Sequence, residues 1–229
     1  MDRQKRFRFL FYAVGIMILA LGLILNTKAG LGVSPIMSLP YCISEIWGWN
    51  FGDTTLVIYC IFVGLQFLLK GKRARLYDLL QIPFSVVFTR VLNFYNGIIQ
   101  IPLEQFWQKI LLLLAALLLT GVGAAMVLNM RLVPNPCDGI VQAVGEAWGK
   151  ETGLAKNLFD LFSVAMSFLL GMAAGNWMCG IGVGTLVGVV CVGRVISLFN
   201  CLFQDKVQRM AGIEGQIGGL CEGRVPEGA

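Results

Sequence analysis

Histidine is absent from this sequence of 229 residues. Its absence excludes Ser-His-Asp and Cys-His catalysis, as well as metal sites built from histidine. The seven cysteines are scattered through apolar stretches without the paired spacing of metal ligands, so we interpret them as small apolar side chains. Neither paired catalytic carboxylates nor a Ser-Lys arrangement is evident. We therefore expect a protein that is not an enzyme and that uses neither a metal nor another cofactor.

Charged residues are also scarce, at 14% of the chain against about 25% in ordinary soluble proteins. Hydrophobic residues make up 57%, and the mean hydropathy is +0.75. The remaining charges lie between long apolar runs, which predicts helices that are surrounded by a lipid bilayer. The net charge of +5 comes mainly from loops and the N-terminal segment, where Arg and Lys set membrane orientation. It does not indicate a nucleic-acid partner.

Six apolar segments are long enough to cross a membrane as helices. They are roughly residues 9–26, 54–69, 79–95, 110–128, 158–174 and 177–203. The first follows a basic stretch, as a signal peptide would, but no small-residue cleavage site comes after it. We therefore predict an uncleaved first transmembrane helix.

Two further apolar segments, residues 35–48 and 136–149, are too short to cross. Each would form about 21 Å of helix, against a hydrocarbon core of about 30 Å. Each begins with proline, which suits the first turn of a helix, and ends at glycine. If both crossed, the basic cluster at residues 70–75 would face outward, against the positive-inside tendency. We therefore predict two re-entrant helices, with both termini cytoplasmic in a bacterial inner membrane.

The spacing of several rare residues is repeated in the second half of the chain. Pro35, Glu45, Trp47, Gly48 and Gly52 recur, with the same spacing, as Pro136, Glu146, Trp148, Gly149 and Gly153. Further along, Arg90, Val91 and Asn96 recur as Arg194, Val195 and Asn200. An odd number of crossings in each half places the second half upside down, which is the inverted-repeat plan of many transporters.

The predicted fold is therefore all-α. It is a polytopic helical membrane protein with six spanning helices and two short re-entrant helices in two inverted repeats. The repeats cover about residues 9–96 and 110–203 of a single membrane domain over residues 1–229. Residues 204–229 are rich in glycine and charge and are predicted to form a short, partly disordered cytoplasmic tail.

The starts of the two short helices are the first candidate site. Ser34 and Pro35 begin one of them, and Asn135 begins the other, with Asp138 in its first turn. Free backbone N–H groups and the positive end of the helix dipole suit a carboxylate or phosphate. Ser34 and Asn135 are also natural N-caps, so capping alone is the alternative interpretation.

Charged residues inside the apolar segments are the second candidate site. Arg90 and Arg194 occupy equivalent places, and the predicted topology pairs them with Glu45 and Glu146, respectively. Such pairs either neutralise buried charge or leave an arginine to contact substrate. Asp160 stands where the first half has tyrosine, and it suggests a cation or proton site, or a hydrated position at the membrane interface.

The run Asn-Thr-Lys-Ala-Gly-Leu-Gly-Val-Ser-Pro at residues 26–35, followed by Gly52-Asp53 and the helix start at residues 78–83, resembles the YczE/YitT-like family of small bacterial membrane proteins. The resemblance covers roughly residues 7–204. It implies a polytopic inner-membrane protein and does not imply a substrate.

The leading functional hypothesis is a secondary transporter or permease for a small anionic or zwitterionic solute. Its site would lie between the starts of the two short helices, near Ser34, Asn135, Arg90 and Arg194. The alternative is a non-transporting membrane partner, such as a binding subunit or assembly factor of another complex. A homo-oligomer is compatible with either hypothesis.

Overall fold

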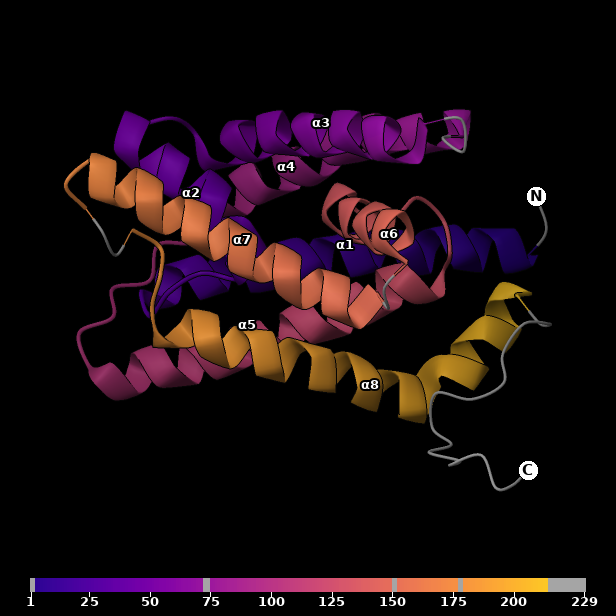
Figure 1. Cartoon of the computed structure of the whole chain (residues 1–229). Helices are drawn as coiled ribbons and strands as arrows, with labels where there is room; N and C mark the ends of the chain where they lie inside the picture. The colour runs from indigo at the N-terminus through magenta and orange to yellow at the C-terminus, as the bar shows by residue number, and fades with distance from the viewer. Residues whose placement is uncertain (1–2, 72–74, 150–151, 177–178, 214–229) are drawn as a thin grey trace, which may run out of the picture.

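The structure is a computed structural model that describes residues 3–71, 75–149, 152–176 and 179–213. Within these residues it is all helical, with no strand, which confirms the predicted all-α class. The elements are α1 (Arg3–Ala29), α2 (Pro35–Trp47), α3 (Phe51–Lys70), the 3₁₀ helix η2 (Leu76–Leu80), α4 (Gln81–Ile98), α5 (Phe106–Asn129), α6 (Pro136–Trp148), α7 (Thr152–Ala173) and α8 (Val183–Ala211) (Figure 1).

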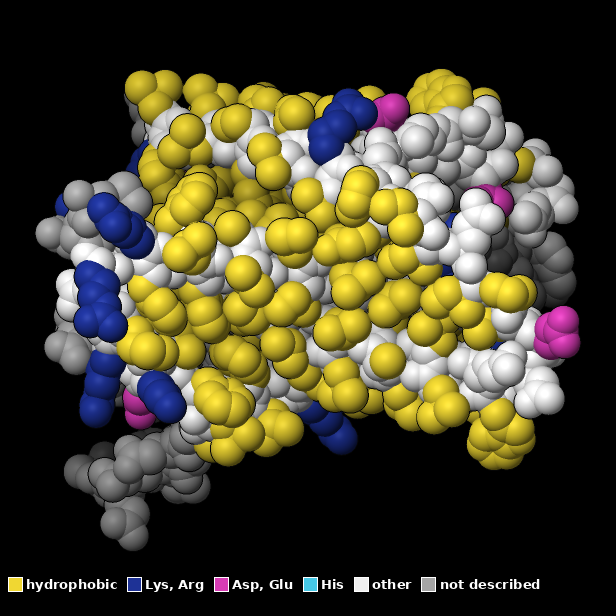
Figure 2. All heavy atoms as spheres, turned by 180° about the vertical axis from the view of Figure 1, so that it is seen from behind, with side chains coloured by type: hydrophobic (Ala, Val, Ile, Leu, Met, Phe, Trp, Pro, Cys, Tyr) yellow, Lys and Arg dark blue, Asp and Glu magenta, His cyan; other side chains and the backbone are white. Residues whose placement is uncertain are grey.

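Five helices, α1, α3, α5, α7 and α8, are long and apolar enough to cross a membrane. The sixth predicted span forms α4, which has 18 residues but does not belong to this group. Its sequence includes Arg90, Asn93 and Asn96, which make it more polar than the others. Figure 2 shows a wide band of hydrophobic side chains across one face of the molecule. The protein is therefore a helical membrane protein with several apolar helices.

The two short helices form where they were predicted. Gly48 and Gly149 end them in the left-handed conformation, with φ of 67° and 60°, which glycine adopts without a steric penalty. In Figure 1, α1 ends and α3 begins at the left of the molecule, whereas α5 ends and α7 begins at the right. Neither α2 nor α6 therefore carries the chain to the opposite end of the bundle.

The C-terminal end of the bundle differs from the prediction. α8 continues past Phe203 to Ala211, so the first part of the predicted tail is helical. Trp177, where the last span was expected to begin, lies outside the described residues, as does most of the tail. Gly212 lies against Gln4, so α8 ends beside the start of α1.

The most extensive contact between helices joins α1 to α5. A Cβ atom on Gly22 would lie 2.5 Å from the backbone N of Thr120, and one on Gly123 would collide with the backbone of Leu19. Glycine lets helix backbones approach this closely. The two contacts are equivalent, because the two repeats are offset by 101 residues. Leu19 corresponds to Thr120, and Gly22 corresponds to Gly123.

The short helices pack across the two halves of the chain: α2 packs on α7, and α6 packs on α3. At the first contact, Ser167 Oγ donates a hydrogen bond to Ser38 Oγ over 2.9 Å. At the second, Gly139 lies against Gln66. These contacts also match, since Ser38 and Gly139, like Gln66 and Ser167, are 101 residues apart.

The close approach of α1 and α5 predicts that Gly22→Ala destabilises the protein by about 1–3 kcal/mol through overpacking. Gly64→Ala is the matched control, because Gly64 lies mid-helix in α3 and a Cβ there meets nothing within 4 Å. The control should be neutral or slightly stabilising, since alanine favours helix. Thermal unfolding in detergent measures both, and equal melting temperatures for the two variants would contradict the packing described.

Candidate functional site

The segments that precede the two short helices are held by hydrogen bonds from other parts of the chain. Before α2, Val33 N donates to Gly180 O over 2.9 Å, and Gly184 N donates to Leu31 O over 2.7 Å. The segment before α8 and the first turn of α8 therefore fix the start of α2. Such bonds are needed because backbone that leaves a helix at membrane depth finds no water there.

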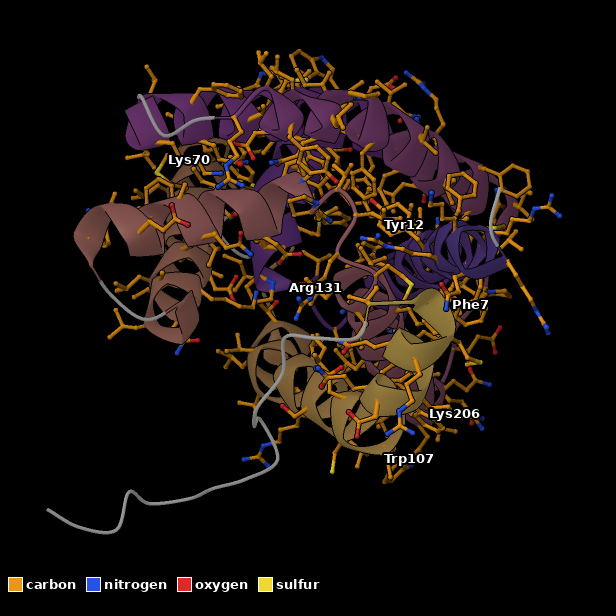
Figure 3. The ribbon with its side chains drawn as sticks, turned by 90° about the vertical axis from the view of Figure 1, so that its right-hand side faces the viewer. Phe7, Tyr12, Lys70, Trp107, Arg131 and Lys206 are labelled. Carbon is orange, nitrogen blue, oxygen red and sulfur yellow. The ribbon has the colours of Figure 1, made fainter. Side chains whose placement is uncertain are left out.

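The segment before α6 is held by side chains of α1 instead. Arg8 Nε donates to Met130 O over 2.7 Å, and Tyr12 Oη donates to Val133 O over 2.7 Å. Figure 3 looks at the end of the molecule where α1 begins, where Tyr12 and Arg131 both lie. The start of α6 is thus anchored to the N-terminal part of the chain.

Capping differs between the two predicted N-cap residues. Asn135 Oδ1 accepts a hydrogen bond from Cys137 N over 3.1 Å and so caps α6. Ser34 occupies the N-cap position of α2, but its side chain makes no capping bond. The prediction of a capping side chain is therefore confirmed for Asn135 and wrong for Ser34. At Ser34, the backbone O accepts from Met37 N instead.

Both helix starts approach Tyr59 of α3, which is only 1% exposed. The Tyr59 hydroxyl donates to Met37 Sδ, in the first turn of α2, over 3.6 Å. Tyr59 also interacts with Cys137 and Asn135 at the start of α6. The first turns of α2 and α6 thus meet at one buried tyrosine.

A cluster of charged side chains lies next to the start of α6. Lys156 Nζ lies 3.5 Å from Asp160 Oδ2, one turn along α7. Asp138, in the first turn of α6, is close enough to interact with the charges of both. Asp160 is only 6% exposed, so its side chain is not hydrated, as one of its two interpretations expected.

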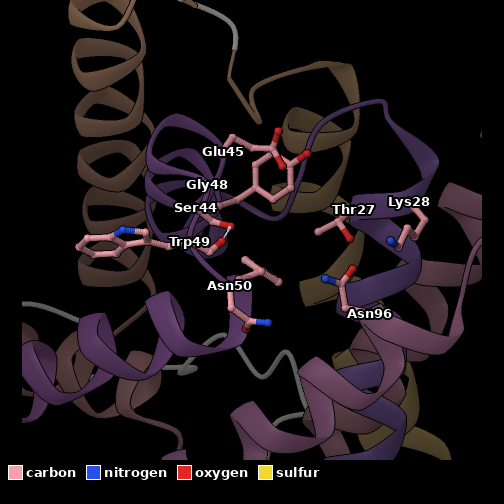
Figure 4. Close-up of a pocket in the computed structure, with 10 residues that line it drawn as sticks. Thr27, Lys28, Ser44, Glu45, Gly48, Trp49, Asn50 and Asn96 are labelled. Atoms are coloured by element: carbon pink, nitrogen blue, oxygen red, sulfur yellow. Dashed lines mark hydrogen bonds between the residues drawn. The ribbon is translucent and has the colours of Figure 1, made fainter.

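A polar pocket lies where α1 and α4 end and α2 returns to the surface. Its volume is about 380 Å³. Figure 4 shows Lys28, Thr27 and Asn96 on one side and Glu45, Ser44 and Asn50 on the other. One pocket thus presents both an ammonium and a carboxylate. Its lining residues are Thr27, Lys28, Tyr41, Ser44, Glu45, Gly48, Trp49, Asn50, Phe51 and Asn96.

A second hollow of about 310 Å³ adjoins this pocket and shares Thr27 and Tyr41 with it. Its walls are mainly the two glycine-rich segments at residues 30–33 and 180–183. Gly32 has φ of 109°, and a Cβ there would lie 2.6 Å from the backbone N of Gly182. The two segments can approach this closely because neither residue has a side chain.

Residues 6–201 match a family of unknown function, DUF6198. The chain belongs to this family. The DUF6198 protein is 26% identical to the uncharacterized protein YyaS of Bacillus subtilis (strain 168) over 196 residues, which cover 84% of this chain and 92% of YyaS. It is 24% identical to the uncharacterized membrane protein YczE of the same organism over 197 residues, or 86% of each chain.

An uncharacterized protein of Haemophilus influenzae (strain ATCC 51907 / DSM 11121 / KW20 / Rd) is 25% identical to the DUF6198 protein over 197 residues, which cover 86% of this chain and 84% of the relative. No solved structure matches the chain significantly. The similarity to YczE confirms the predicted YczE-like relationship and agrees with the membrane character of the helices.

The two arginines of the DUF6198 protein do not form the predicted ion pairs. Arg90 Nη1 lies 3.0 Å from Asp53 Oδ1, and both side chains are more than half exposed. Glu45 instead lines the polar pocket. The reason is that α4 packs along α3, which places Arg90 beside the first turn of α3.

In the second half of the DUF6198 protein, Arg194 and Glu146 are both exposed, and neither forms an ion pair with a described residue. α8 packs mainly on α5 and not on α6, which keeps the two side chains apart. Among the predicted binding residues, the structure thus gathers Asn135 and Asp138 near Tyr59. Pro35 is buried at the start of α2, whereas both arginines lie elsewhere.

Sequence reasoning missed Lys28, Tyr41 and Lys156 as members of these sites. Lys28 lies within the run that carries the YczE-like resemblance, which was an available signal. Lys156 precedes Asp160 by four residues, the spacing at which side chains meet on a helix. Nothing in the sequence distinguished Tyr41 from other aromatic residues.

The difference in capping predicts that Asn135→Ala lowers stability by about 1 kcal/mol, because the N–H of Cys137 loses its partner. Ser34→Ala is the matched control at the equivalent helix start and should change stability by less than about 0.5 kcal/mol. Thermal unfolding of both purified variants measures the effects. A larger loss for Ser34→Ala than for Asn135→Ala would contradict the capping described.

Proposed function

We propose that this protein is a secondary transporter or permease for a small zwitterionic or anionic solute in the bacterial inner membrane. The observation that carries the proposal is the pair of short helices that start inside the bundle and return to opposite ends of it. Broken helices of this kind, related by an inverted repeat, form the central sites of many transporters. The proposal involves no enzymatic step.

Matched contacts support the inverted repeat. When each residue is replaced by its counterpart 101 positions away in the other half, the contact Gly22–Thr120 becomes Gly123–Leu19. In the same way, Ser38–Ser167 becomes Gly139–Gln66. A two-fold relation between the halves produces this reciprocity, as it does in symmetric dimers. With α4 as a sixth crossing, each half would cross three times, and the halves would be oppositely oriented.

The distribution of basic residues supports a cytoplasmic location for both termini. Lys70, Arg131 and Lys206 lie at the end of the molecule where α1 begins. In Figure 2, most of the visible Lys and Arg side chains gather at this same end, on the left of that view. Cytoplasmic ends of membrane proteins carry such an excess. The polar pocket then opens toward the outside.

The polar pocket favours a zwitterion over a simple anion. Lys28 would hold a carboxylate or phosphate, and Glu45 would hold an ammonium group. The adjoining hollow continues from Tyr41 toward the start of α2, which supplies a route inward. Val33, which lines this hollow, immediately precedes the predicted residues Ser34 and Pro35 in the chain, whereas Asn135 and Asp138 lie at the other helix start.

Cysteine labelling tests the inverted orientation at equivalent positions. Trp47 and Trp148 are 53% and 60% exposed and end the two short helices. In a cysteine-free background, Trp47→Cys should react with an impermeant maleimide from outside intact cells. Trp148→Cys should react only after the membrane is opened. Labelling of both positions from the same side would refute opposite orientations.

Solute flux in proteoliposomes tests the transport function across a panel of amino acids, betaines and small anions. For a zwitterion, Lys28→Gln and Glu45→Gln should each raise the half-saturation concentration roughly tenfold or more, because each removes a charge-assisted bond. For an anion, only Lys28→Gln should do so. Glu104→Gln is the control, since Glu104 is exposed and outside the pocket.

The alternative function, as a non-transporting membrane partner, makes the opposite prediction. Purification from native membranes would then recover a stoichiometric partner protein, and reconstituted protein would show no flux and no solute-induced thermal shift. That combination would overturn the transporter proposal.

A further inference from the structure

A cavity of about 280 Å³ lies between α7 and α8. In the first half, α3 packs on α4 through the stacked rings of Tyr59 and Phe88, whose centroids are 6.1 Å apart. The corresponding residues of the second half are Asp160 and Val192. In the second half, α8 packs mainly on α5 and is not among the helices that pack extensively on α7, so the space between α7 and α8 is not filled.

The cavity is mainly apolar and opens at the side of the bundle. Leu161 and Leu186, which line it, are 65% and 71% exposed. Both belong to helices that are apolar enough to cross the membrane, so the mouth faces lipid. The lining residues are Pro35, Asn157, Asp160, Leu161, Val164, Ile181, Thr185, Leu186 and Val189.

Asp160 supplies the carboxylate of this cavity, and one of its oxygens has no hydrogen-bond partner. Asp160 Oδ1 is fully buried and unpaired, whereas Oδ2 lies 3.5 Å from Lys156 Nζ. An unpaired carboxylate oxygen is costly at membrane depth. A proton on this oxygen removes most of that cost.

The net charge of the side chains around Asp160 also favours the binding of one proton. Asp138 and Asp160 carry two negative charges when ionised, and Lys156 carries one positive charge. Addition of one proton to Asp160 makes the cluster neutral and leaves Lys156 to balance Asp138. Asp138 is the less suitable acceptor, because it lies in the first turn of α6, where the helix dipole favours the ionised form.

Other titratable groups around Asp160 do not change this balance. Cys137 faces the cluster from α6 and is apolar in character when protonated. On α2, Cys42 contacts Ser167, two turns or about 10 Å along α7 from Asp160. The residues of α8 that line the cavity carry no ionisable side chain.

We propose that Asp160 is a proton-binding site that is open to the bilayer side through the cavity between α7 and α8. A proton from water adds to Oδ1, the aspartate becomes a neutral acid, and its release returns the carboxylate to Lys156. Within the proposed function, on which this last role rests, Asp160 would be the site of the coupling proton.

A metal cation fits this cavity less well than a proton. Hard cations take several oxygen ligands, and the walls consist mainly of leucine, isoleucine and valine side chains. Among the residues that the structure describes, no group of three or more His, Cys, Asp or Glu side chains could hold a metal.

Labelling with dicyclohexylcarbodiimide tests the proton site without any transport assay. This reagent partitions into lipid and reacts with protonated carboxyl groups. In wild-type protein in vesicles, peptide mass spectrometry should find the adduct on Asp160, at least tenfold faster at pH 6 than at pH 9. Asp53 is the internal control, because it is paired with Arg90 outside the cavity and should remain unmodified. No adduct on Asp160 at any pH, or a rate independent of pH, would overturn the proposal.

Two variants distinguish the titration of Asp160 from the access of the reagent to the cavity. Val189→Phe narrows the cavity and should slow the reaction at every pH while leaving its pH midpoint unchanged. Lys156→Gln removes the neighbouring ammonium and should move the midpoint to higher pH, since the ionised carboxylate loses its partner. A midpoint that does not move in Lys156→Gln would count against Asp160 as the titrating group.

The coupling role needs a transported solute and is tested separately. Asp160→Asn should retain exchange of solute across the membrane but lose accumulation driven by a pH gradient. Full accumulation in a folded Asp160→Asn protein would overturn the coupling role. If no solute is transported but Asp160 labels as expected, the proposed function fails and the proton site stands.

Discussion

The need to satisfy backbone hydrogen bonds inside a bilayer constrains the rest of this structure. Each half interrupts its helices before a short helix, and the N–H and C=O groups freed there need partners that a bilayer cannot supply. In the first half, a second glycine-rich segment supplies the partners, through Gly180 and Gly184. In the second half, Arg8 and Tyr12 of α1 supply them. The short helices start where they do because these partners are in place.

The two halves therefore share one arrangement of helices and differ in some of the contacts between them. The glycine contacts between α1 and α5 follow the repeat, and so do the contacts of α2 with α7 and of α6 with α3. The helix pairs that flank them do not, because α3 packs on α4 through Tyr59 and Phe88, whereas α8 packs mainly on α5 and leaves a cavity between itself and α7. Asp160, which stands in the place of Tyr59, lines this cavity. The two halves thus differ in both packing and charge.

Local patterns in the sequence were enough to locate the helices. The prolines at the starts of α2 and α6 and the glycines after them gave the boundaries of both short helices, whereas the apolar runs located the long helices but began six residues late at α1 and α7. These signals act over a few residues and do not depend on tertiary contacts. The end of α8 was missed, since its last turns are polar and resemble a tail.

Partners of charged residues could not be read from local patterns. Arg90 pairs with Asp53 because α4 lies along α3, and nothing near Arg90 in the sequence encodes that alignment. The burial of Asp160 likewise depends on α2 and α6 packing against α7. Asn135 was predicted correctly as a cap because capping is a local interaction. Tertiary arrangement thus limits what sequence can predict about the site.

The contact between α1 and α5 bears on how the halves can move. At Gly22 and Gly123 the backbone of each helix lies directly against the other helix, with Thr120 and Leu19 as the nearest residues. A contact of this kind keeps the distance between the two helix axes fixed. Movement of one half against the other along this line of contact preserves the packing, whereas opening a gap across it would forfeit the most extensive helix–helix contact among the described residues.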